Sequence, residues 1–473
     1  MSDAPARPEA PGPDAAPFRD ALFTDLYQLT MMQSYWREGM TAEATFSLFV
    51  RDLGTRNALL ACGLEQALAF LEGVQFSEEA LGYLAAQEQF DTDFIDVLAD
   101  FSFAGDVRAV PEGTPVFPDE PLVEVTAPLP QAQLVETFLL NQITFQTNVA
   151  TKARRVKDAA GEATVADFGA RRTHGTDAAL AGARAMYVGG VDASSNVRAG
   201  RRYGLPITGT MAHSYIEAHE SEQAAFRNFS DVFPETTLLV DTYDPLEGVR
   251  KVIRLAEKQG PGFRVGALRL DSGDLGALAK QAREMLDEAG LEEVALFASG
   301  GLDEFKIRDL LAGGAPLDGF GVGTAMGVVR DQPALDSAYK LCGYAGQPRM
   351  KLSSKKSNLP GRKQVFRFSE GGTSEGGTAA RDVIAPAGED PPPEGRPLLQ
   401  NVMAGGERTE AGERTPPDEL RAYAEEATDA LPERLRALEK TEEPYPVELS
   451  GAMRERLEEV RGRLEEQMGT EAG

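Results

Sequence analysis

Three residues that can do chemistry lie after short apolar runs in the middle of the chain. His213 lies in the sequence GTMAHS, and Asp271 and Asp274 lie in RLDSGD. Histidine is rare here, with three copies in 473 residues, so a histidine among small residues at the end of an apolar run stands out. Its ring can transfer a proton or accept a phosphoryl group. The competing interpretation, a structural histidine in the core, stays open.

The two aspartates of RLDSGD suit a metal ion or a sugar. Mg²⁺ commonly binds one or two carboxylates together with substrate phosphate oxygens, and carboxylates also accept hydrogen bonds from ribose hydroxyls. The alternative is local, because Asp271 or Ser272 can cap the helix that follows. The roles are compatible, and we expect Asp271 and Asp274 as candidate Mg²⁺ ligands.

Two glycine-rich turns are candidates for phosphate binding, Ser299-Gly300-Gly301 and Gly321-Val322-Gly323-Thr324. Glycines between a strand and a helix let backbone N–H groups approach an anion, and the helix N-terminus adds a favourable dipole. Each turn taken alone is equally consistent with a tight turn that binds nothing. Two such turns on consecutive strand–helix units resemble a phosphate cradle.

Basic residues cluster in one segment of an otherwise acidic chain. A run of charge is usually a solvated face, but this local concentration favours a patch for a polyanionic substrate. The cluster comprises Lys351, Lys355, Lys356, Arg362, Lys363 and Arg367.

A repeated strand–helix pattern must position these residues. Several repeats are about 30 residues long, the length of a βα unit. Pro245–Gln259 and Asp274–Glu288 are the clearest helices, each with a glycine just beyond its end. Such repeats predict a parallel sheet, closed or nearly closed as a barrel, with its chemistry at the carboxyl ends of the strands. The predicted strands are Ala163–Phe168, Pro206–Gly209, Thr237–Asp241, Val265–Leu270, Val294–Ala298 and Gly319–Val322.

The flanks follow other patterns. Residues 18–100 predict helices, clearest over Phe23–Trp36 and Leu59–Leu71. Residues 105–130 predict short strands, and residues 131–158 predict a long helix. Further on, the pattern predicts strand–loop–strand over 351–368, a loop over 369–395, and amphipathic helices over 417–440 and 449–468.

The composition excludes several classes of protein. A net charge of −27 repels nucleic acid and anionic lipid, so we expect neither as a partner. No run of about 18 apolar residues suits a membrane span. Cys62 and Cys342 fit no CxxC pattern, and we expect two buried thiols in a reducing cytoplasm, although a disulfide stays open. Residues 1–17 predict a disordered arm rather than a signal peptide.

Eight motifs in order resemble those of nicotinate phosphoribosyltransferases, over roughly residues 20–370. Each motif alone is weak, but their order is specific. The motifs are DLYQLTM (25–31), FxxRR (168–172), ASSN (193–196), GTMAHS (209–214), RLDSGD (269–274), SGGL (299–302), GVGT (321–324) and KLSxKKxxxPGRKQVxR (351–367).

The resemblance implies a type II phosphoribosyltransferase fold, an irregular parallel α/β barrel with a second α/β sandwich domain built from both chain ends. We therefore expect the N-terminal part of the sandwich over 18–150, the barrel over 151–340, the rest of the sandwich with its basic loop over 341–410, and C-terminal helices over 411–473. A homodimer with sites near the subunit interface is also implied.

The family joins nicotinate to PRPP, giving nicotinate mononucleotide and diphosphate for NAD biosynthesis, with Mg²⁺ expected and ATP hydrolysis coupled to the reaction. The resemblance implies that ATP phosphorylates His213, that Arg269 binds a carboxylate or phosphate, and that Asp271 handles ribose or Mg²⁺. Tyr27 and Phe168 would sandwich the pyridine ring. The other substrate-binding residues implied are Arg171, Ser195, Asn196 and Ser214, and the phosphate-binding residues are Ser299, Gly300, Gly301, Gly323, Thr324, Lys351, Lys356 and Lys363.

Two alternatives remain at this stage. Nicotinamide phosphoribosyltransferases are similar but place an acid near the substrate amide, where this chain has Ser195. A non-catalytic nucleotide-binding barrel would keep the fold without the chemistry. The joint presence of His213, Arg269, Asp271 and both glycine turns favours the enzyme.

Overall fold

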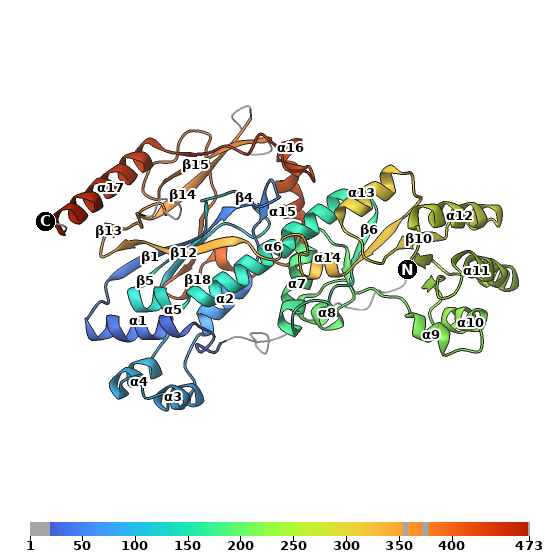
Figure 1. Cartoon of the computed structure of the whole chain (residues 1–473), viewed down its shortest axis with the longest axis horizontal. Coiled ribbons are helices and arrows are strands. Elements are labelled where there is room, and N and C mark those ends of the chain that lie inside the picture. Colours follow the sequence, from blue (N-terminus) through green and yellow to red (C-terminus); the bar gives the residue numbers. More distant parts are fainter. Residues whose placement is uncertain (1–18, 353–357, 371–376, 472–473) are drawn as a thin grey trace. The chain divides into compact units, whose positions relative to one another are not determined.

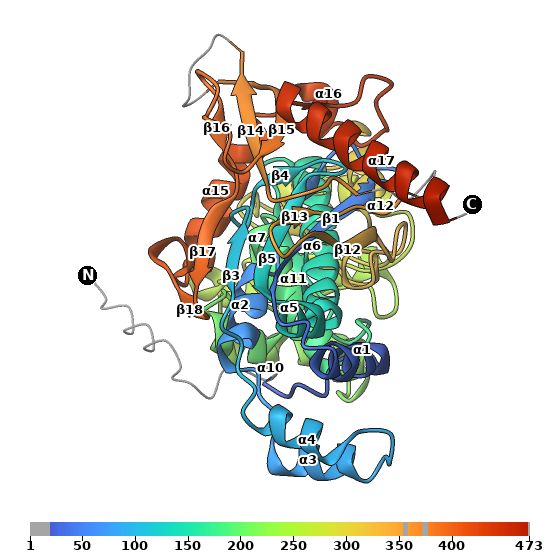
Figure 2. The same cartoon turned by 90° about the vertical axis from the view of Figure 1, so that its left-hand side faces the viewer.

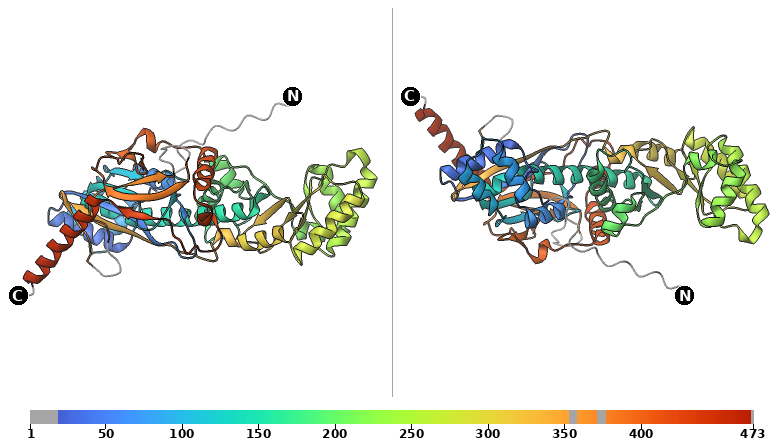
Figure 3. Two further views of the ribbon diagram at one scale, coloured as in Figure 1. Left: turned by 90° about the horizontal axis from the view of Figure 1, so that it is seen from above. Right: turned by 90° about the horizontal axis from the view of Figure 1, so that it is seen from below.

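The computed structural model describes residues 19–352, 358–370 and 377–471 of the chain. The fold is mixed α/β and divides into two compact units. We call Val149–Pro333 the central unit, and Met1–Asn148 with Ala334–Gly473 the terminal unit. Both chain ends belong to the terminal unit, so blue and orange-to-red segments interleave there in Figure 3. The expected fold class is thereby confirmed, whereas the five-part division of the chain stays a prediction.

A six-stranded parallel sheet forms the middle of the central unit, in the order β7-β6-β11-β10-β9-β8. The interior-facing residues Leu268, Leu296 and Phe320 are fully buried, as expected for parallel strands covered by crossover helices. The sheet is a half-barrel, more open than the barrel predicted. The strands are β6 (Thr164–Asp167), β7 (Ala193–Ser194), β8 (Thr237–Leu239), β9 (Ala267–Leu270), β10 (Ala295–Ala298) and β11 (Gly319–Val322).

The helices of the central unit follow its strands, as Figure 1 shows for α11, α12 and α13. Helix α11 has the predicted bounds, Pro245–Gln259, and α12 begins one residue after its predicted start. The predicted strand Pro206–Gly209 is wrong, since only Ile207 forms a bridge, to Ser194. The helices are α7 (Thr176–Val188), α8 (Val197–Tyr203), α9 (His213–Glu217), α10 (Glu222–Val232), α11, α12 (Leu275–Glu288), α13 (Glu304–Ala312) and α14 (Thr324–Gly327).

The terminal unit is built on a seven-stranded sheet in the order β13-β12-β1-β5-β3-β17-β18. Strand β1 pairs with β5 on one side and with β12, which lies almost 300 residues later, on the other. Figure 2 shows β17 and β18 beside β3, so residues beyond 400 complete a sheet that starts near residue 43. The strands are β1 (Glu43–Asp52), β3 (Asp106–Ala109), β5 (Pro121–Pro128), β12 (Asp336–Tyr344), β13 (Gln347–Pro348), β17 (Gln400–Ala404) and β18 (Glu407–Arg408).

A four-stranded sheet, β16-β14-β15-β19, and a two-stranded sheet, β2-β4, complete the strands described in the terminal unit. They comprise β2 (Leu59–Leu60), β4 (Pro115–Val116), β14 (Lys363–Ser369), β15 (Ala379–Pro386), β16 (Arg396–Pro397) and β19 (Val447–Leu449). The helices are α1 (Leu26–Arg37), α2 (Leu64–Gly73), α3 (Glu78–Ala85), α4 (Thr92–Ala99), α5 (Leu129–Leu134), α6 (Glu136–Ala160), α15 (Pro417–Asp429), α16 (Glu433–Arg436) and α17 (Gly451–Glu471), of which α6 continues into the central unit.

Two sequence predictions for the terminal unit are wrong. Residues 18–100 were expected to be helical, but β1 is a ten-residue strand. Seven consecutive β1 residues are buried, so the strand lacks the alternation that marks a half-exposed strand and its apolar run resembles a buried helix. The predicted loop over 369–395 contains β15, whose last five residues are buried. The Gly- and Pro-rich neighbours of this short strand hide it.

Candidate active site

The strands β6, β9, β10 and β11 are parallel neighbours in register, so their carboxyl ends meet at one edge of the sheet. Asp167 ends β6, Leu270 ends β9 and Ala298 ends β10. The loops that follow these strands therefore start side by side, which is where parallel α/β sheets place their ligands.

Arg269 contacts four other side chains at this edge of the sheet. Its side chain is 11% exposed, and its Nε donates to Oγ of Ser299 at 2.7 Å while Nη1 donates to Oγ1 of Thr210 at 3.3 Å. Its Nη2 donates to Oδ1 of Asp271 at 2.5 Å. The guanidinium carbon lies 5.5 Å from the ring centroid of Phe168. Because every arm of the side chain has a partner, the cation is held in one orientation.

Asp271 is fixed by the same network. Its Oδ1 accepts hydrogen bonds from Arg269 and from Oγ of Ser299. Burial alone would raise the pKa of this carboxyl group, but the bonds from Ser299 and Arg269 and the nearby positive charges outweigh it, and the pKa is lowered. Asp271 is therefore a carboxylate at neutral pH, with Oδ2 turned towards the histidine.

His213 is the first residue of α9, and its side chain is 42% exposed. Its Nδ1 lies 3.1 Å from Oγ1 of Thr242, in a hydrogen bond whose direction depends on the tautomer. Its Nε2 lies 3.9 Å from Oδ2 of Asp271. The histidine is thus not the buried core residue of the alternative interpretation, and its ring is open to a substrate.

A buried carboxylate, Asp241, is hydrogen-bonded to the loop that carries Asp271. Asp241 is 7% exposed, and its Oδ2 accepts hydrogen bonds from the backbone N–H of Asp271 at 2.9 Å and from Oγ of Ser272 at 2.8 Å. Its Oδ1 is buried and has no hydrogen-bond partner among the described residues. An unpartnered buried carboxylate oxygen beside a polar site fits a cation or hydroxyl donor supplied by a ligand.

The first glycine turn, at Gly300 and Gly301, has the left-handed backbone geometry that glycine accepts most easily. Gly300 has φ +93°, and a Cβ atom there would lie 1.8 Å from the carbonyl oxygen of Asp271. Gly301 follows with φ +65°, while α13 begins later and is capped by Asp303. Helix α14 begins at Thr324, directly after Gly323, and no side chain caps it. The first amide groups of α14 are therefore available to an anion.

The remaining predicted residues of the central unit divide into two kinds. Phe168 packs under Arg269, and Arg171 and Ser214 are exposed. Asn196 caps α8 by accepting from the N–H of Ala199 at 3.1 Å, and the N–H of Ser195 donates to the carbonyl of Asp167 at 2.9 Å. Asn196 therefore has a local structural role, and its predicted contact with substrate stays a prediction.

Asp274 caps α12, since its Oδ1 accepts from the N–H of Ala277 at 3.1 Å. The sequence assigned this cap to Asp271 or Ser272 as an alternative, so the residue that caps is a different one. No group of three or more His, Cys, Asp and Glu side chains within the described residues is arranged to hold a metal ion. A Mg²⁺ ion at this edge would therefore depend on substrate oxygens for most of its ligands.

Four predicted residues belong to the terminal unit. Tyr27 is 47% exposed on α1, and burial together with Glu136 raises its pKa to about 12, so it is a neutral phenol. Lys351 is exposed, and Lys356 lies outside the described residues. Lys363 is 2% exposed, with its ammonium 3.0 Å from Glu124 and donating to the carbonyl of Gly361 at 2.6 Å. Its charge is thus used inside the protein, which favours a structural role over phosphate binding.

Sequence reasoning did not assign roles to Asp241, Thr242, Thr210 and Asp167, although each contacts or supports the site. Asp167 is 1% exposed and accepts hydrogen bonds from Oγ of Ser194 at 2.7 Å and from the N–H of Gly169 at 2.6 Å. The sequence feature that could have identified them is their position at the carboxyl end of a predicted strand.

Among the described residues, no helix combines the length and the apolar character that a membrane span requires.

Comparison with known proteins supports a single family. The family model of the nicotinate phosphoribosyltransferase N-terminal domain matches residues 22–144, and that of the quinolinate phosphoribosyl transferase C-terminal domain matches residues 149–333. The chain is 51% identical to nicotinate phosphoribosyltransferase pncB2 of Mycobacterium tuberculosis, over 91% of each chain. It is 43% identical to the Bacillus subtilis enzyme, over 74% of this chain and 73% of that one.

Solved structures agree with the sequence comparison. The crystal structure of human nicotinic acid phosphoribosyltransferase matches with a TM-score of 0.80 at 29% identity, covering 92% of this chain and 99% of that one. The match to the nicotinate-nucleotide pyrophosphorylase of Pyrococcus furiosus has a TM-score of 0.70 at 25% identity, covering 87% and 95%. From its sequence and its fold, this chain belongs to the nicotinate phosphoribosyltransferase family.

Proposed function

We propose that the chain joins nicotinate to the ribose phosphate of PRPP, forming nicotinate mononucleotide and diphosphate, with ATP hydrolysed to ADP and phosphate through a phosphohistidine at His213. The observation that carries the proposal is the hydrogen-bonded cluster of Arg269, Asp271 and Ser299 with His213 beside it. The cluster offers a cation, a carboxylate and a ring nitrogen around one point.

The chemistry assigns a task to each group. The bond from ribose C1′ to the diphosphate oxygen breaks while a bond from C1′ to the pyridine nitrogen forms, so the sugar becomes positive and the diphosphate takes the electron pair. The Asp271 carboxylate lies where it can hold ribose hydroxyls and stabilise that positive charge. Arg269, fixed by three side chains, can hold a substrate carboxylate or phosphate in one orientation.

His213 can receive the γ-phosphoryl group of ATP on a ring nitrogen, releasing ADP, and water later breaks the P–N bond to give phosphate. The phosphorylated ring would place an anion next to Asp271 and change the affinity of the site for PRPP. The resemblance to the family supports this coupling, and the 42% exposure of the ring provides access for it.

Mg²⁺ fits the site as a partner of the substrates. Oδ2 of Asp271 and the unpartnered Oδ1 of Asp241 are the carboxylate oxygens that could hold it, together with phosphate oxygens of PRPP. When bound, the ion would neutralise charge on the departing diphosphate. We further propose a cytoplasmic homodimer, in which the two reduced, buried thiols Cys62 and Cys342 suit the compartment.

The testing experiment incubates the purified chain with PRPP, Mg²⁺ and either nicotinate or nicotinamide, with and without ATP, and follows mononucleotide and ADP. We expect product from nicotinate, with ADP formed in proportion. Product mainly from nicotinamide would show that the pocket near Ser195 was misinterpreted. No product from either substrate, at low and high salt, would instead favour a non-catalytic nucleotide-binding barrel.

A further inference from the structure

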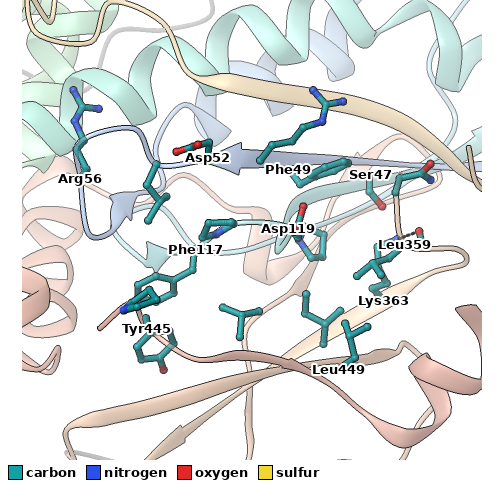
Figure 4. Close-up of a pocket in the computed structure, with 18 of the residues that line it drawn as sticks. Ser47, Phe49, Asp52, Arg56, Phe117, Asp119, Leu359, Lys363, Tyr445 and Leu449 are labelled. Carbon is teal, nitrogen blue, oxygen red and sulfur yellow. Dashed lines mark hydrogen bonds between the residues drawn. The ribbon is translucent and has the colours of Figure 1, made fainter. Parts of the chain in front are cut away.

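A pocket of about 580 Å³ lies among residues of the terminal unit alone. One wall comes from β1 and the turn after Phe117, and the opposite wall from β15, β19 and α17. Figure 4 shows Ser47, Phe49 and Asp52 along one side and Tyr445 and Leu449 along the other. Apart from Lys363, no residue predicted for phosphoribosyl transfer lines this pocket.

The inner part of the pocket suits an apolar body. Phe49, Phe117, Ile384 and Tyr445 are all less than 7% exposed, and Leu449 lies on the side opposite Phe49 in Figure 4. The volume falls within the range of about 300–1,000 Å³ typical of small-molecule sites. The space is therefore large enough for a compound of two fused rings, or for an acyl chain.

The charge of the lining is opposite to that of the chain. Acidic residues outnumber basic ones by 75 to 48 in the whole sequence. In the pocket, basic residues outnumber acidic ones by five to two, with Arg51, Arg56, Lys363, Lys440 and Arg461 against Asp52 and Asp119. A local excess of cations in an acidic protein favours an anionic ligand.

Two of these five cations, Lys440 and Arg461, are not paired with a carboxylate among the described residues. Lys363 is paired with Glu124 at 3.0 Å and Arg51 with Asp336 at 2.9 Å. Lys440 donates to the carbonyl oxygens of Gly54 at 2.8 Å and Arg56 at 2.9 Å, which leaves its positive charge in place. Arg461 is exposed and forms no ion pair with any described residue.

The two acidic residues of the lining do not balance the charge of its cations. Desolvation raises the pKa of Asp119, against the opposing effect of Arg51, so its negative charge is disfavoured. Asp52 is exposed, and its Oδ1 accepts from the N–H of Gly54 at 2.6 Å. The positive excess therefore lies with Lys440, held at Gly54 and Arg56, and separately with Arg461 on α17, while the aromatic residues of the lining are buried.

We propose that this pocket binds an organic anion that combines an apolar ring system or chain with one sulfonate, carboxylate or phosphate head group. The apolar body occupies the space between Phe49, Ile384 and Leu449, and the head group lies by Arg461 of α17. Such a ligand would act on the terminal unit, separately from the cluster around Arg269.

The test uses the full-length chain and two fluorescent probes that differ in charge. The anionic probe is 8-anilinonaphthalene-1-sulfonate, and the uncharged one is N-phenyl-1-naphthylamine. Arg461→Gln removes the free cation, and Arg454→Gln is the matched control, because Arg454 is an exposed arginine of the same helix outside the lining. Leu449→Trp fills the apolar space, and Leu457→Trp fills it from α17 if the first variant misfolds.

We expect Arg461→Gln to weaken binding of the anionic probe by roughly 2–5-fold, the effect of one solvent-facing charge contact. The uncharged probe should be unaffected by Arg461→Gln, and Arg454→Gln should change neither probe. Leu449→Trp or Leu457→Trp should abolish one site for both probes while the transferase reaction continues.

Two results would overturn the proposal. If neither filling variant removes a site in a folded protein, with an unchanged thermal midpoint, then the pocket binds no apolar body. If filling removes both probes but Arg461→Gln leaves the anionic probe as tightly bound as before, then the site is apolar only and the anionic class of ligand is wrong. Both results are independent of whether the chain transfers a phosphoribosyl group.

Discussion

At the scale of single residues, the geometry of the site is set by a few side chains that each form several hydrogen bonds. Arg269 contacts Ser299, Thr210 and Asp271, and stacks on Phe168. Removing any partner changes the orientation of the others, so single substitutions here will not have additive effects. The exposed histidine is different, because its only hydrogen bond to a described side chain is with Thr242.

His213→Ala tests the coupling to ATP at this scale. We expect the variant to keep its fold, since the side chain is 42% exposed, and to lose the stimulation of mononucleotide formation by ATP. Initial rates with and without ATP measure the effect, and circular dichroism checks the fold. An ATP dependence equal to that of the unsubstituted chain would eliminate the phosphohistidine role, whether or not nicotinate is the substrate.

Asp271 predicts a dependence of stability on pH. Its folded-state pKa is lowered, so its stabilising contribution is present above the unfolded pKa of about 3.9 and is lost as pH falls through the folded value. The difference in urea unfolding midpoint between the unsubstituted chain and Asp271→Asn should be constant from about pH 8 to pH 5 and shrink only below about pH 4. A difference that grows on acidification would contradict the lowered pKa.

At the scale of elements, the strand ends are set by glycines as much as by apolar residues. Gly300 follows β10 with φ +93°, and its missing side chain leaves room for the carbonyl of Asp271. This close approach holds the loop after β9 against the loop after β10. The position of Asp271 therefore depends on a residue that makes no side-chain contact at all.

Gly300→Ala measures that dependence. We expect a loss of roughly 2–5 kcal/mol in the free energy of unfolding, from left-handed backbone strain together with the clash at Asp271. Gly290→Ala is the control, since Gly290 has φ +70° but no atom within 4 Å of an added Cβ, and it should cost only about 1–2 kcal/mol. Equal losses for the two variants would show that the close approach has no energetic weight.

The same scale explains what the sequence could predict. The apolar runs of the central unit lie between glycines and capping residues, so α11, α12 and β11 are found at or within a residue of their predicted bounds. The motifs after these runs located the cluster at Arg269 and Asp271. Local patterns do not encode which distant residue will pair, so they missed the strand identity of β1, the role of Asp241 and the burial of Lys363 against Glu124.

At the scale of the whole molecule, the chain carries a net charge of −27. Acidic side chains of like sign repel one another in the compact state, and dissolved salt screens that repulsion, with a Debye length of about 10 Å at 0.1 M. The buried ion pair of Arg367 with Asp382, joined at 2.6 Å, is screened much less. Added salt should therefore weaken the repulsion between surface charges more than it weakens buried ion pairs.

We expect the thermal unfolding midpoint to rise by several degrees between about 0.05 and 0.5 M NaCl, as repulsion in the acidic surface is screened. Calorimetry at constant pH measures the shift, and sucrose at matched osmolality is the control for effects other than charge. A midpoint that is unchanged by NaCl, or that rises equally in sucrose, would show that surface repulsion does not limit the stability of this chain.

The pairing of β1 with β12 also fixes an order of events during synthesis. A ribosome that has completed β1 must add almost 300 residues before β12 exists to pair with it, a delay of roughly 15–60 s at 5–20 residues per second. Over that interval the edge of β1 that later pairs with β12 stays unpaired from Ala44 to Asp52, and most residues of β1 are ones that the folded chain buries. The strands of the central unit, in contrast, all find their partners within one continuous segment. The central unit can therefore fold on the nascent chain before the terminal unit is complete. Chaperone binding should concentrate on the unpaired edge of β1.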